Sequence, residues 1–162
     1  MTIMSVGIPA MTTVASFLEK APVDVLGIAT TFGIAVWEQE LEKGISGKLT
    51  RDPINGGPSG FSILVNAPES LTRKRFTVAH EIAHYLLHRT KMGEEIADDT
   101  FYRSGLSSAQ EVEANKLAAD IIMPYPLIYS LQRTGVSGVP ELANILQVSL
   151  TAMMIRLGIP IP

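Results

Sequence analysis

The spacing of apolar residues gives the chain a helical start and a strand-like middle. Apolar positions recur at helical intervals over Thr12–Lys20 and Val23–Thr31, so both stretches are predicted to be short helices. Three short runs rich in Val, Ile, Phe and Trp follow, and clusters of Gly, Ser, Asn and Pro separate them. These runs are Gly33–Leu41, Ile45–Thr50 and Phe61–Asn66. They predict a small antiparallel sheet.

A helical period returns at Leu71 and predicts a long central helix that ends near His88. The apolar stripe of this helix consists of Phe76, Ala79, Ile82, Ala83, Leu86 and Leu87. The stretch Thr90–Gly105 carries four acids and no clear period. It is predicted to be a long connection, of the kind that often lines a site.

The rest of the chain has helical character. One helix begins at Ser107 or Ser108 and runs to about Met123, where two prolines stop it. Two or three short helices follow, including Glu141–Gln147 and Leu150–Leu157.

This order of elements predicts an α+β fold in which the small antiparallel sheet packs on the central helix. The chain has no internal repeat and no linker long enough to divide it, so residues 1–162 are expected to form a single domain. Within it, residues 1–124 form the core and residues 125–162 a helical C-terminal extension.

Composition and charge narrow the chemistry. The chain has 162 residues, three His, no Cys and a net charge of −3. The lack of cysteine excludes a disulfide scaffold, an iron–sulfur cluster and thiol catalysis, so a metal would be bound by His and carboxylates. An acidic chain does not favour nucleic acid as the main partner. No apolar run approaches the roughly 18 residues of a spanning helix, which predicts a cytoplasmic protein with no membrane partner.

The strongest motif is an H-E-x-x-H sequence formed by His80, Glu81 and His84 inside the central helix. Residues four apart on a helix lie about 40° apart around its axis and about 6 Å along it. Both imidazoles can therefore bind one metal ion from one face. Glu81 lies beside them and can take a proton from a water molecule at that ion. The alternative is a helix with two ordinary surface histidines.

A catalytic zinc takes three protein ligands and keeps a fourth position open. Glu111 and Glu113 of the next helix are two residues apart, so their side chains point about 200° apart and only one can face the metal. Glu111 shares its face with small residues, whereas the face of Glu113 is charged and typical of a solvent-exposed surface. The face therefore selects Glu111 as third ligand and places Asn115 where it can hydrogen-bond a ligating His. The alternative is that both acids are exposed helix charges.

Two neighbouring groups have less specific interpretations. His88 lies one turn beyond His84, too far along a straight helix to share the ion, and is predicted to cap the helix end or to pack against the connection. The basic run at residues 73–75 is either a solvated turn or an anchor for an acidic substrate segment. It could also anchor the connection through Asp98 and Asp99.

Four side chains are candidates for stabilising the oxyanion of a tetrahedral intermediate: Tyr85, Tyr102, Arg103 and Tyr125. Tyr102 and Arg103 stand out because they lie in the connection between the two ligand helices. Each of the four can equally be structural, and the sequence does not rank them.

The assembled residues resemble the ImmA/IrrE family of zinc-dependent metallopeptidases. The resemblance rests on the stretch from Arg75 to His88, on Glu-Val-Glu-Ala-Asn at 111–115 and on Ile-Ile-Met-Pro at 121–124. Upstream strands extend it to roughly residues 23–124. The family's usual Gly before the second His is Ala83 here, a small-for-small change.

The resemblance implies a gluzincin-like core with zinc bound by His80, His84 and Glu111. Characterised members cut helix-turn-helix repressors and thereby release genes of mobile elements or of a DNA-damage response. A DNA-binding repressor is therefore the implied protein substrate. On resemblance alone, Phe61–Asn66 is also the sheet edge at which a substrate strand would pair.

The stretch Leu142–Leu157 has the helix, tight turn and helix of a DNA-reading motif. However, the charges beyond Tyr125 are Arg133, Glu141 and Arg156, which sum to +1. A second helix made mostly of apolar residues has little with which to contact phosphates or base edges. The composition favours packing or partner docking over direct nucleic-acid binding.

The sequence as a whole predicts a zinc-dependent endopeptidase with one Zn²⁺ per chain and Glu81 as general base. The rival function is that of a non-proteolytic metal-binding regulator, which docks to a repressor or to DNA in a toxin–antitoxin or phage context. An intact Glu81 favours the enzyme, because a purely structural zinc has no use for a general base.

Overall fold

The three strands form one mixed sheet whose middle strand is the last in sequence. The computed structural model describes residues 12–92 and 108–162. Its strands are β1 (Ile34–Gln39), β2 (Gly47–Arg51) and β3 (Phe61–Asn66), in the spatial order β1-β3-β2. Strand β3 pairs in parallel with β1, Ile34 opposite Phe61, and antiparallel with β2, Leu49 opposite Ile63.

The sheet corrects two expectations. The predicted antiparallel pairing holds for β2 and β3 but is wrong for β1 and β3, because the 40–60 segment is long enough for the crossover that a parallel pair needs. Phe61–Asn66 is the central strand, so the prediction that it forms the edge is also wrong. Five of its six residues are buried, as a strand flanked on both sides requires. The edges are β1 and β2.

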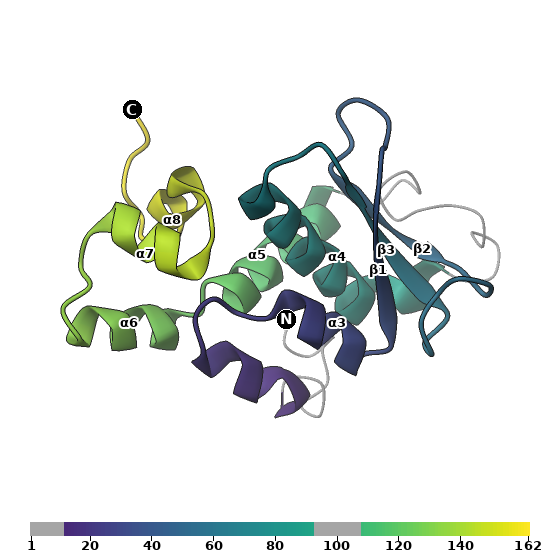
Figure 1. Ribbon diagram of the computed structural model, residues 1–162, viewed down its shortest axis with the longest axis horizontal. Helices are drawn as coiled ribbons and strands as arrows, with labels where there is room; N and C mark the ends of the chain where they lie inside the picture. The colour runs from purple at the N-terminus through teal and green to yellow at the C-terminus, as the bar shows by residue number, and fades with distance from the viewer. Residues whose placement is uncertain (1–11, 93–107) are drawn as a thin grey trace.

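Helix α4 (Leu71–Met92) runs through the middle of the molecule and organises the other layers. It contacts β2 and β3 on one side and α5 (Ser108–Ile122) on another (Figure 1). Its predicted apolar stripe is buried around Ala79, Ile82 and Ala83. The α+β architecture predicted from the sequence is confirmed.

Helix α4 is one turn longer than predicted, and this changes the interpretation of His88. The helix continues to Met92, with Arg89 and Lys91 in its last turn, where cations suit the helix dipole. His88 therefore lies inside the helix and does not cap it. Its side chain is fully buried.

The N-terminal segment packs against the same core. The predicted Thr12–Lys20 helix is a 3₁₀ helix, η1 (Ala15–Glu19), preceded by one helical turn. Helix α3 (Val25–Thr31) begins at Asp24, whose carboxylate accepts a hydrogen bond from the backbone N–H of Gly27 at 2.9 Å.

Three short helices form the C-terminal segment: α6 (Tyr125–Arg133), α7 (Val139–Leu146) and α8 (Leu150–Arg156). They lie beyond the ends of α4 and α5, away from the sheet (Figure 1). Between α7 and α8 the chain turns at Gln147, which has a left-handed backbone with φ 53°. Two helices and a tight turn are therefore present, as the sequence predicts.

Two arginines attach the C-terminal segment to the rest of the protein. Arg75 of α4 donates to the carbonyl oxygens of Gln147 at 3.2 Å and Val23 at 2.8 Å. Arg156 of α8 donates to the carbonyl oxygen of Met123 at 2.8 Å. Gln147 and Met123 follow the C-terminal ends of α7 and α5, so each guanidinium satisfies a backbone acceptor that a helix end leaves open. Within the described ranges, no helix has the length and apolar character needed to cross a membrane.

Candidate metal centre and active site

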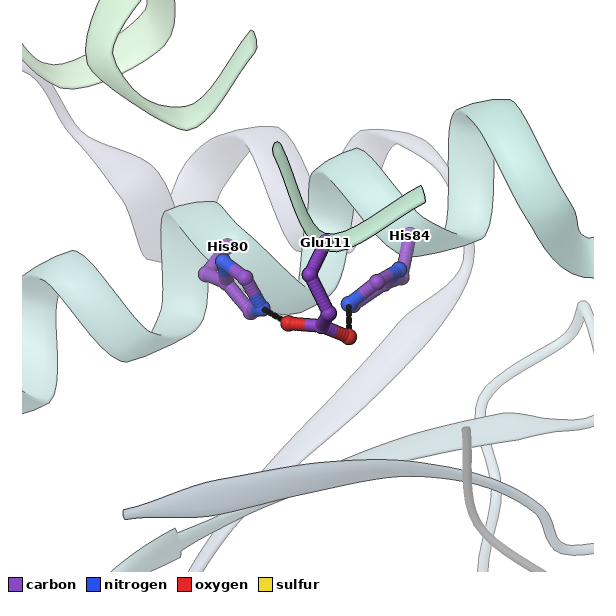
Figure 2. A group of neighbouring side chains, drawn as sticks. All are labelled: His80, His84 and Glu111. Carbon is purple, nitrogen blue, oxygen red and sulfur yellow. Dashed lines mark ion pairs between the residues drawn. The ribbon is translucent and has the colours of Figure 1, made fainter. Parts of the chain in front are cut away.

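Helices α4 and α5 bring two histidines and one carboxylate together. His80 and His84 are one turn apart on α4, with ring centroids 4.6 Å apart. Glu111, in the first turn of α5, lies between them (Figure 2). One carboxylate oxygen is 3.3 Å from Nε2 of His80, and the other is 3.0 Å from Nε2 of His84.

These three side chains fit a metal ion of the zinc type. They offer one ligand atom each, and the three atoms lie within 4.8 Å of one another. Two ligand atoms of a tetrahedral zinc, each about 2.1 Å from the ion, are about 3.4 Å apart, close to the distances between Glu111 and each imidazole. Two imidazoles and one carboxylate form a donor set of the catalytic kind, which leaves a fourth position open.

Burial keeps both imidazoles neutral, which is the form that binds a metal. Desolvation lowers the pKa of His80, although the nearby Glu111 carboxylate opposes the shift. The pKa of His84 is lowered to about 3, first by desolvation and then by the neighbouring His80 and His88. A neutral imidazole has a lone pair available for a metal ion.

Glu81 is a buried acid next to this cluster. Its side chain is 2% exposed, and its Oε2 atom has no hydrogen-bond partner among the described residues. Desolvation, followed by the charge of Glu111, raises its pKa to about 8, although the backbone N–H of Leu49 donates to it. An acid held this way is strongly perturbed, as groups at catalytic sites often are.

The cluster borders an open cleft of about 330 Å³. The wall opposite the histidines comes from the segment that leads into β2. The lining residues are Gly44, Ser46, Gly47, Arg73, Phe76, Thr77, His80, Glu81 and Asn115. A side chain at Gly47 would overlap the methyl group of Thr77 and approach the carbonyl oxygen of Leu64, so the wall requires glycine there.

The two acids of α5 have different partners, and the sequence predicted only that of Glu111. Glu111 faces His80 and His84, as predicted from its helix face. Glu113 does not simply face solvent: its carboxylate lies 3.7 Å from Nε2 of His88. Asn115, exposed and one turn beyond Glu111, lines the cleft together with His80, and its side chain acts to raise the pKa of His80. Its hydrogen bond to a ligating His stays a prediction.

The oxyanion candidates do not gather at this cleft in the described part of the chain. Tyr102 and Arg103 lie outside the described residues, as do Asp98 and Asp99. Tyr85 packs against Phe61 with ring centroids 5.1 Å apart. Tyr125 donates its hydroxyl to the carbonyl oxygen of Arg156 at 3.0 Å.

The basic run at 73–75 divides into three separate roles. Arg75 holds the C-terminal segment, and Lys74 pairs with Glu38 at 3.2 Å. Arg73 lines the cleft, where its Nε donates to the hydroxyl of Ser46 at 3.2 Å. It is thus a cation beside the cluster, a position that the sequence did not single out, because helical spacing alone does not show which turn faces the sheet.

Comparison with known proteins agrees with this geometry. Residues 29–158 match the family model Peptidase_M78, the IrrE N-terminal-like domain. The chain belongs to this family. The resemblance to the ImmA/IrrE metallopeptidases is thereby confirmed, and residues such as His80 and Glu111 lie within the matched stretch.

One relative and one protein of similar fold carry descriptive names. This chain is 35% identical over 107 residues to the radiation response metalloprotease IrrE of Deinococcus radiodurans. The aligned stretch covers 62% of this chain and 31% of the relative. The chain therefore spans about a third of that relative. A Mycobacterium tuberculosis transcriptional regulator has a similar fold, with a TM-score of 0.60 and 18% identity over 93% of this chain and 46% of that one.

Proposed function

We propose that this chain is a zinc-dependent endopeptidase with one Zn²⁺ held by His80, His84 and Glu111. The observation that carries the proposal is the meeting of two neutral imidazoles with one carboxylate at 3.0 and 3.3 Å, next to an open cleft that His80 and the buried acid Glu81 line. A purely structural site has no need of the open cleft or of the acid.

The chemistry that zinc supplies at such a site is Lewis acidity, which makes a water molecule more acidic and polarises a carbonyl. Glu81 contributes the proton transfer. Its carboxylate accepts the proton of the attacking water and passes it to the nitrogen of the leaving amine. The unpartnered Oε2 atom is the acceptor available for this step.

Glu81 becomes a base at neutral pH only when a cation offsets its burial. Without one, its pKa of about 8 keeps the carboxyl protonated near pH 7. A positive charge at the neighbouring cluster lowers the pKa of a carboxyl group. Glu81 is thus a base in the loaded site and an acid without it.

The substrate backbone is proposed to pair with the free edge of β2. Asp52 donates to the carbonyl oxygen of Gly60, and Ser46 accepts from the N–H of Asn66, so residues of this parity bond to the β3 side. Residues of the parity of Leu49 therefore present their polar backbone groups to the open edge. Gly47, which lines the cleft, has that parity. An extended peptide added there lies alongside Glu81 and gains backbone hydrogen bonds with few demands on its sequence. Strand β2 therefore replaces β3 as the proposed docking edge.

A second groove of about 620 Å³ continues from the cleft between α5 and α8. Phe76 and Asn115 line both the cleft and this groove. Val112 and Ile155 are 54% and 64% exposed on its walls. We propose that apolar side chains of the substrate enter it. In this arrangement residues 1–124 supply the catalytic core, and the extension 125–162 completes the groove.

The proposed substrate is a regulatory protein of the DNA-binding repressor type. The support for it is the family membership, together with a relative named a radiation response metalloprotease and a fold neighbour named a transcriptional regulator. An acidic chain with few free cations in its C-terminal helices favours a protein partner over DNA.

Cleavage of a repressor tests the proposal. The zinc-loaded protein is incubated with the repressor encoded nearest to its gene, and fragments are identified by mass spectrometry. We expect one or a few cleaved bonds with the parent and none with Glu81→Gln, which keeps the size of the side chain but removes the base. Full biological activity of Glu81→Gln would instead favour a binding regulator.

A further inference from the structure

We infer that His88 and Glu113 are positioning residues that hold His84 in the tautomer whose Nε2 lone pair faces Glu111 and a metal ion. The inference rests on the proposed function, because it concerns the metal site that the function requires. It gives a role to a buried histidine that cannot itself reach the ion.

The three side chains form a continuous row across the α4–α5 interface. Nδ1 of His84 lies 2.9 Å from Nδ1 of His88. Nε2 of His88 lies 3.7 Å from a carboxylate oxygen of Glu113, an electrostatic contact somewhat longer than a hydrogen bond. The row therefore leads from the ligand atom of His84 to an acid whose side chain is 38% exposed.

Hydrogen-bond chemistry allows two proton arrangements in this row. Two Nδ1 atoms at 2.9 Å require one to carry a proton and the other a lone pair. If His84 is the donor, its Nε2 keeps a lone pair, and the proton of His88 lies on Nε2, facing Glu113. If His88 is the donor, its Nε2 lone pair faces the Glu113 carboxylate, and His84 carries a proton where the metal would bind.

Without a cation, the Glu111 carboxylate at 3.0 Å favours a proton on Nε2 of His84. A metal ion bound at that Nε2 excludes the proton there, and the charge of Glu113 then supports the first arrangement. A carboxylate attracts an N–H and repels a lone pair, so it favours the proton on Nε2 of His88. His88 then accepts from Nδ1 of His84, and the lone pair of Nε2 of His84 faces Glu111 and the ion. The result is a carboxylate–histidine–histidine row, an extended form of the carboxylate–histidine contact that orients metal-binding imidazoles elsewhere.

The two metal-binding histidines have different neighbours. His80, whose side chain is 16% exposed, lines the cleft beside Asn115. His84 is 1% exposed, and its Nδ1 faces the buried His88. The spacing of Glu111 and Glu113 places one acid at the ligand end of His84 and the other at the far end of the row.

Zinc affinity of single variants tests the inference. His88→Leu removes the acceptor at similar bulk, whereas His88→Asn keeps an oxygen near the position of Nδ1. Glu113→Gln removes the charge, and Glu40→Gln is the matched control at an exposed position. Zn²⁺ dissociation constants are measured by competition with a chromophoric chelator, and the melting temperature of each metal-free variant is recorded separately.

We expect His88→Leu to weaken zinc binding by roughly 10- to 100-fold and Glu113→Gln by about 10-fold. His88→Asn should stay within about threefold of the parent, since it restores the acceptor. Glu40→Gln should not change the dissociation constant. Nitrogen NMR of the zinc-loaded parent should show the proton of His84 on Nδ1 and that of His88 on Nε2, a signature that a merely structural role would not produce.

The outcomes separate the inference from the function on which it rests. If the parent binds zinc and both His88→Leu and Glu113→Gln bind it equally tightly, the inference is wrong and the proposed function stands. An unprotonated Nδ1 of His84 in the loaded parent overturns it as well, even if His88→Leu fails to fold. If the parent does not bind zinc, the metal site and the inference both fail.

Discussion

The α4–α5 interface and the C-terminal helices bury their side chains to a similar degree but bury different chemistry. Along α4 the buried groups include His84 and His88 beside α5 and Glu81 beside β2, all titratable. In α7 and α8 they are apolar, with Leu142, Leu146 and Met153 fully buried. Burial of titratable groups in the first region costs desolvation free energy, and the apolar side chains of the second region have no such cost.

The difference lies in what the polar groups contact. At the site, polar side chains face one another, and burial shifts the pKa of each imidazole downward and that of Glu81 upward. In the C-terminal region Arg156 is satisfied by the Met123 carbonyl and by Asp120 at 2.8 Å each. Buried groups with shifted pKa values, beside the unpartnered Oε2 of Glu81, indicate a site that a ligand completes, whereas satisfied groups with no such shift indicate packing. Substitutions in the first region should therefore alter metal binding and activity, and those in the second stability.

The largest expected effect is that of Glu81→Gln on cleavage. The amide cannot accept the water proton, so the rate should fall by several orders of magnitude while zinc binding is retained. The rate is measured on the cleaved repressor under single-turnover conditions, with zinc content determined on the same samples. Loss of zinc in this variant would place Glu81 in the ligand set instead.

The next effect is loss of metal on removal of a ligand. His84→Ala and Glu111→Ala should each weaken zinc binding by at least about 100-fold, because three groups share one ion. The dissociation constants are obtained by chelator competition. Glu113→Ala should have the smaller effect. If Glu113→Ala abolished binding while Glu111→Ala did not, the assignment of the third ligand from its helix face would be wrong.

The buried acid and imidazoles should give the metal-free protein a stability maximum near pH 6.5. The pKa of His84 falls from 6.5 to about 3 on folding, so the free energy of unfolding decreases as the pH drops below 6.5. The lowered pKa values of His80 and His88 change the free energy of unfolding in the same direction. The pKa of Glu81 rises from 4.5 to about 8 on folding, so Glu81 lowers the free energy of unfolding as the pH rises towards 8.

Melting curves recorded between pH 4 and pH 9, at steps of roughly half a pH unit, test these opposite effects of the histidines and of Glu81 on stability. The loss of unfolding free energy from pH 6.5 to 8 should be about 2 kcal/mol, from a slope of about 1.4 kcal/mol per pH unit for one proton. Glu81→Gln should abolish this alkaline loss. It should also steepen the fall from pH 6.5 to 4.5, because the raised pKa of Glu81 opposes the effect of the histidines in that range. An unchanged alkaline loss in the variant would assign it to another group.

Removal of Arg156 tests whether substitutions in the C-terminal helices alter stability and leave metal binding unchanged. Its side chain is 9% exposed, donates to two acceptors and lies 3.7 Å from the centre of the Tyr125 ring. Arg156→Ala should lower the unfolding free energy by about 1–3 kcal/mol and leave zinc affinity unchanged. Arg133→Ala, at an exposed position of the same segment, is the control and should change neither. Denaturant titrations give both values.

The smallest effect is expected for DNA. The two helices after Gly138 have a helix–turn–helix arrangement, but Arg156 is already occupied and the segment nets only +1. We expect no sub-micromolar binding to duplex DNA at about 150 mM salt, since specific binding needs several phosphate contacts. A fluorescence titration that shows sequence-selective binding would make the C-terminal helices a DNA-reading surface after all.

The sequence predicted those features that depend on neighbours along the chain. The pairing of His80 with His84 follows from the helix repeat, and the choice of Glu111 over Glu113 follows from the angle between positions two apart. Both are local geometry. The strands were located nearly as the structure has them, because turn residues and β-branched runs mark them directly. That these residues bind a metal stays a prediction.

Only the tertiary structure decided which elements meet. The order of the strands depends on the pairing of segments far apart in the chain, so the central place of β3 and the open edge of β2 could not be derived from periodicity. The expectation that His88 caps the helix was wrong for the same reason: α4 runs one turn further, and α5 places Glu113 beside that turn. The sequence by itself determined which side chains share a helix face, since that needs only the helix repeat. Which face meets which partner is set by packing energies that sum over the whole core, and these exist only once the chain has folded.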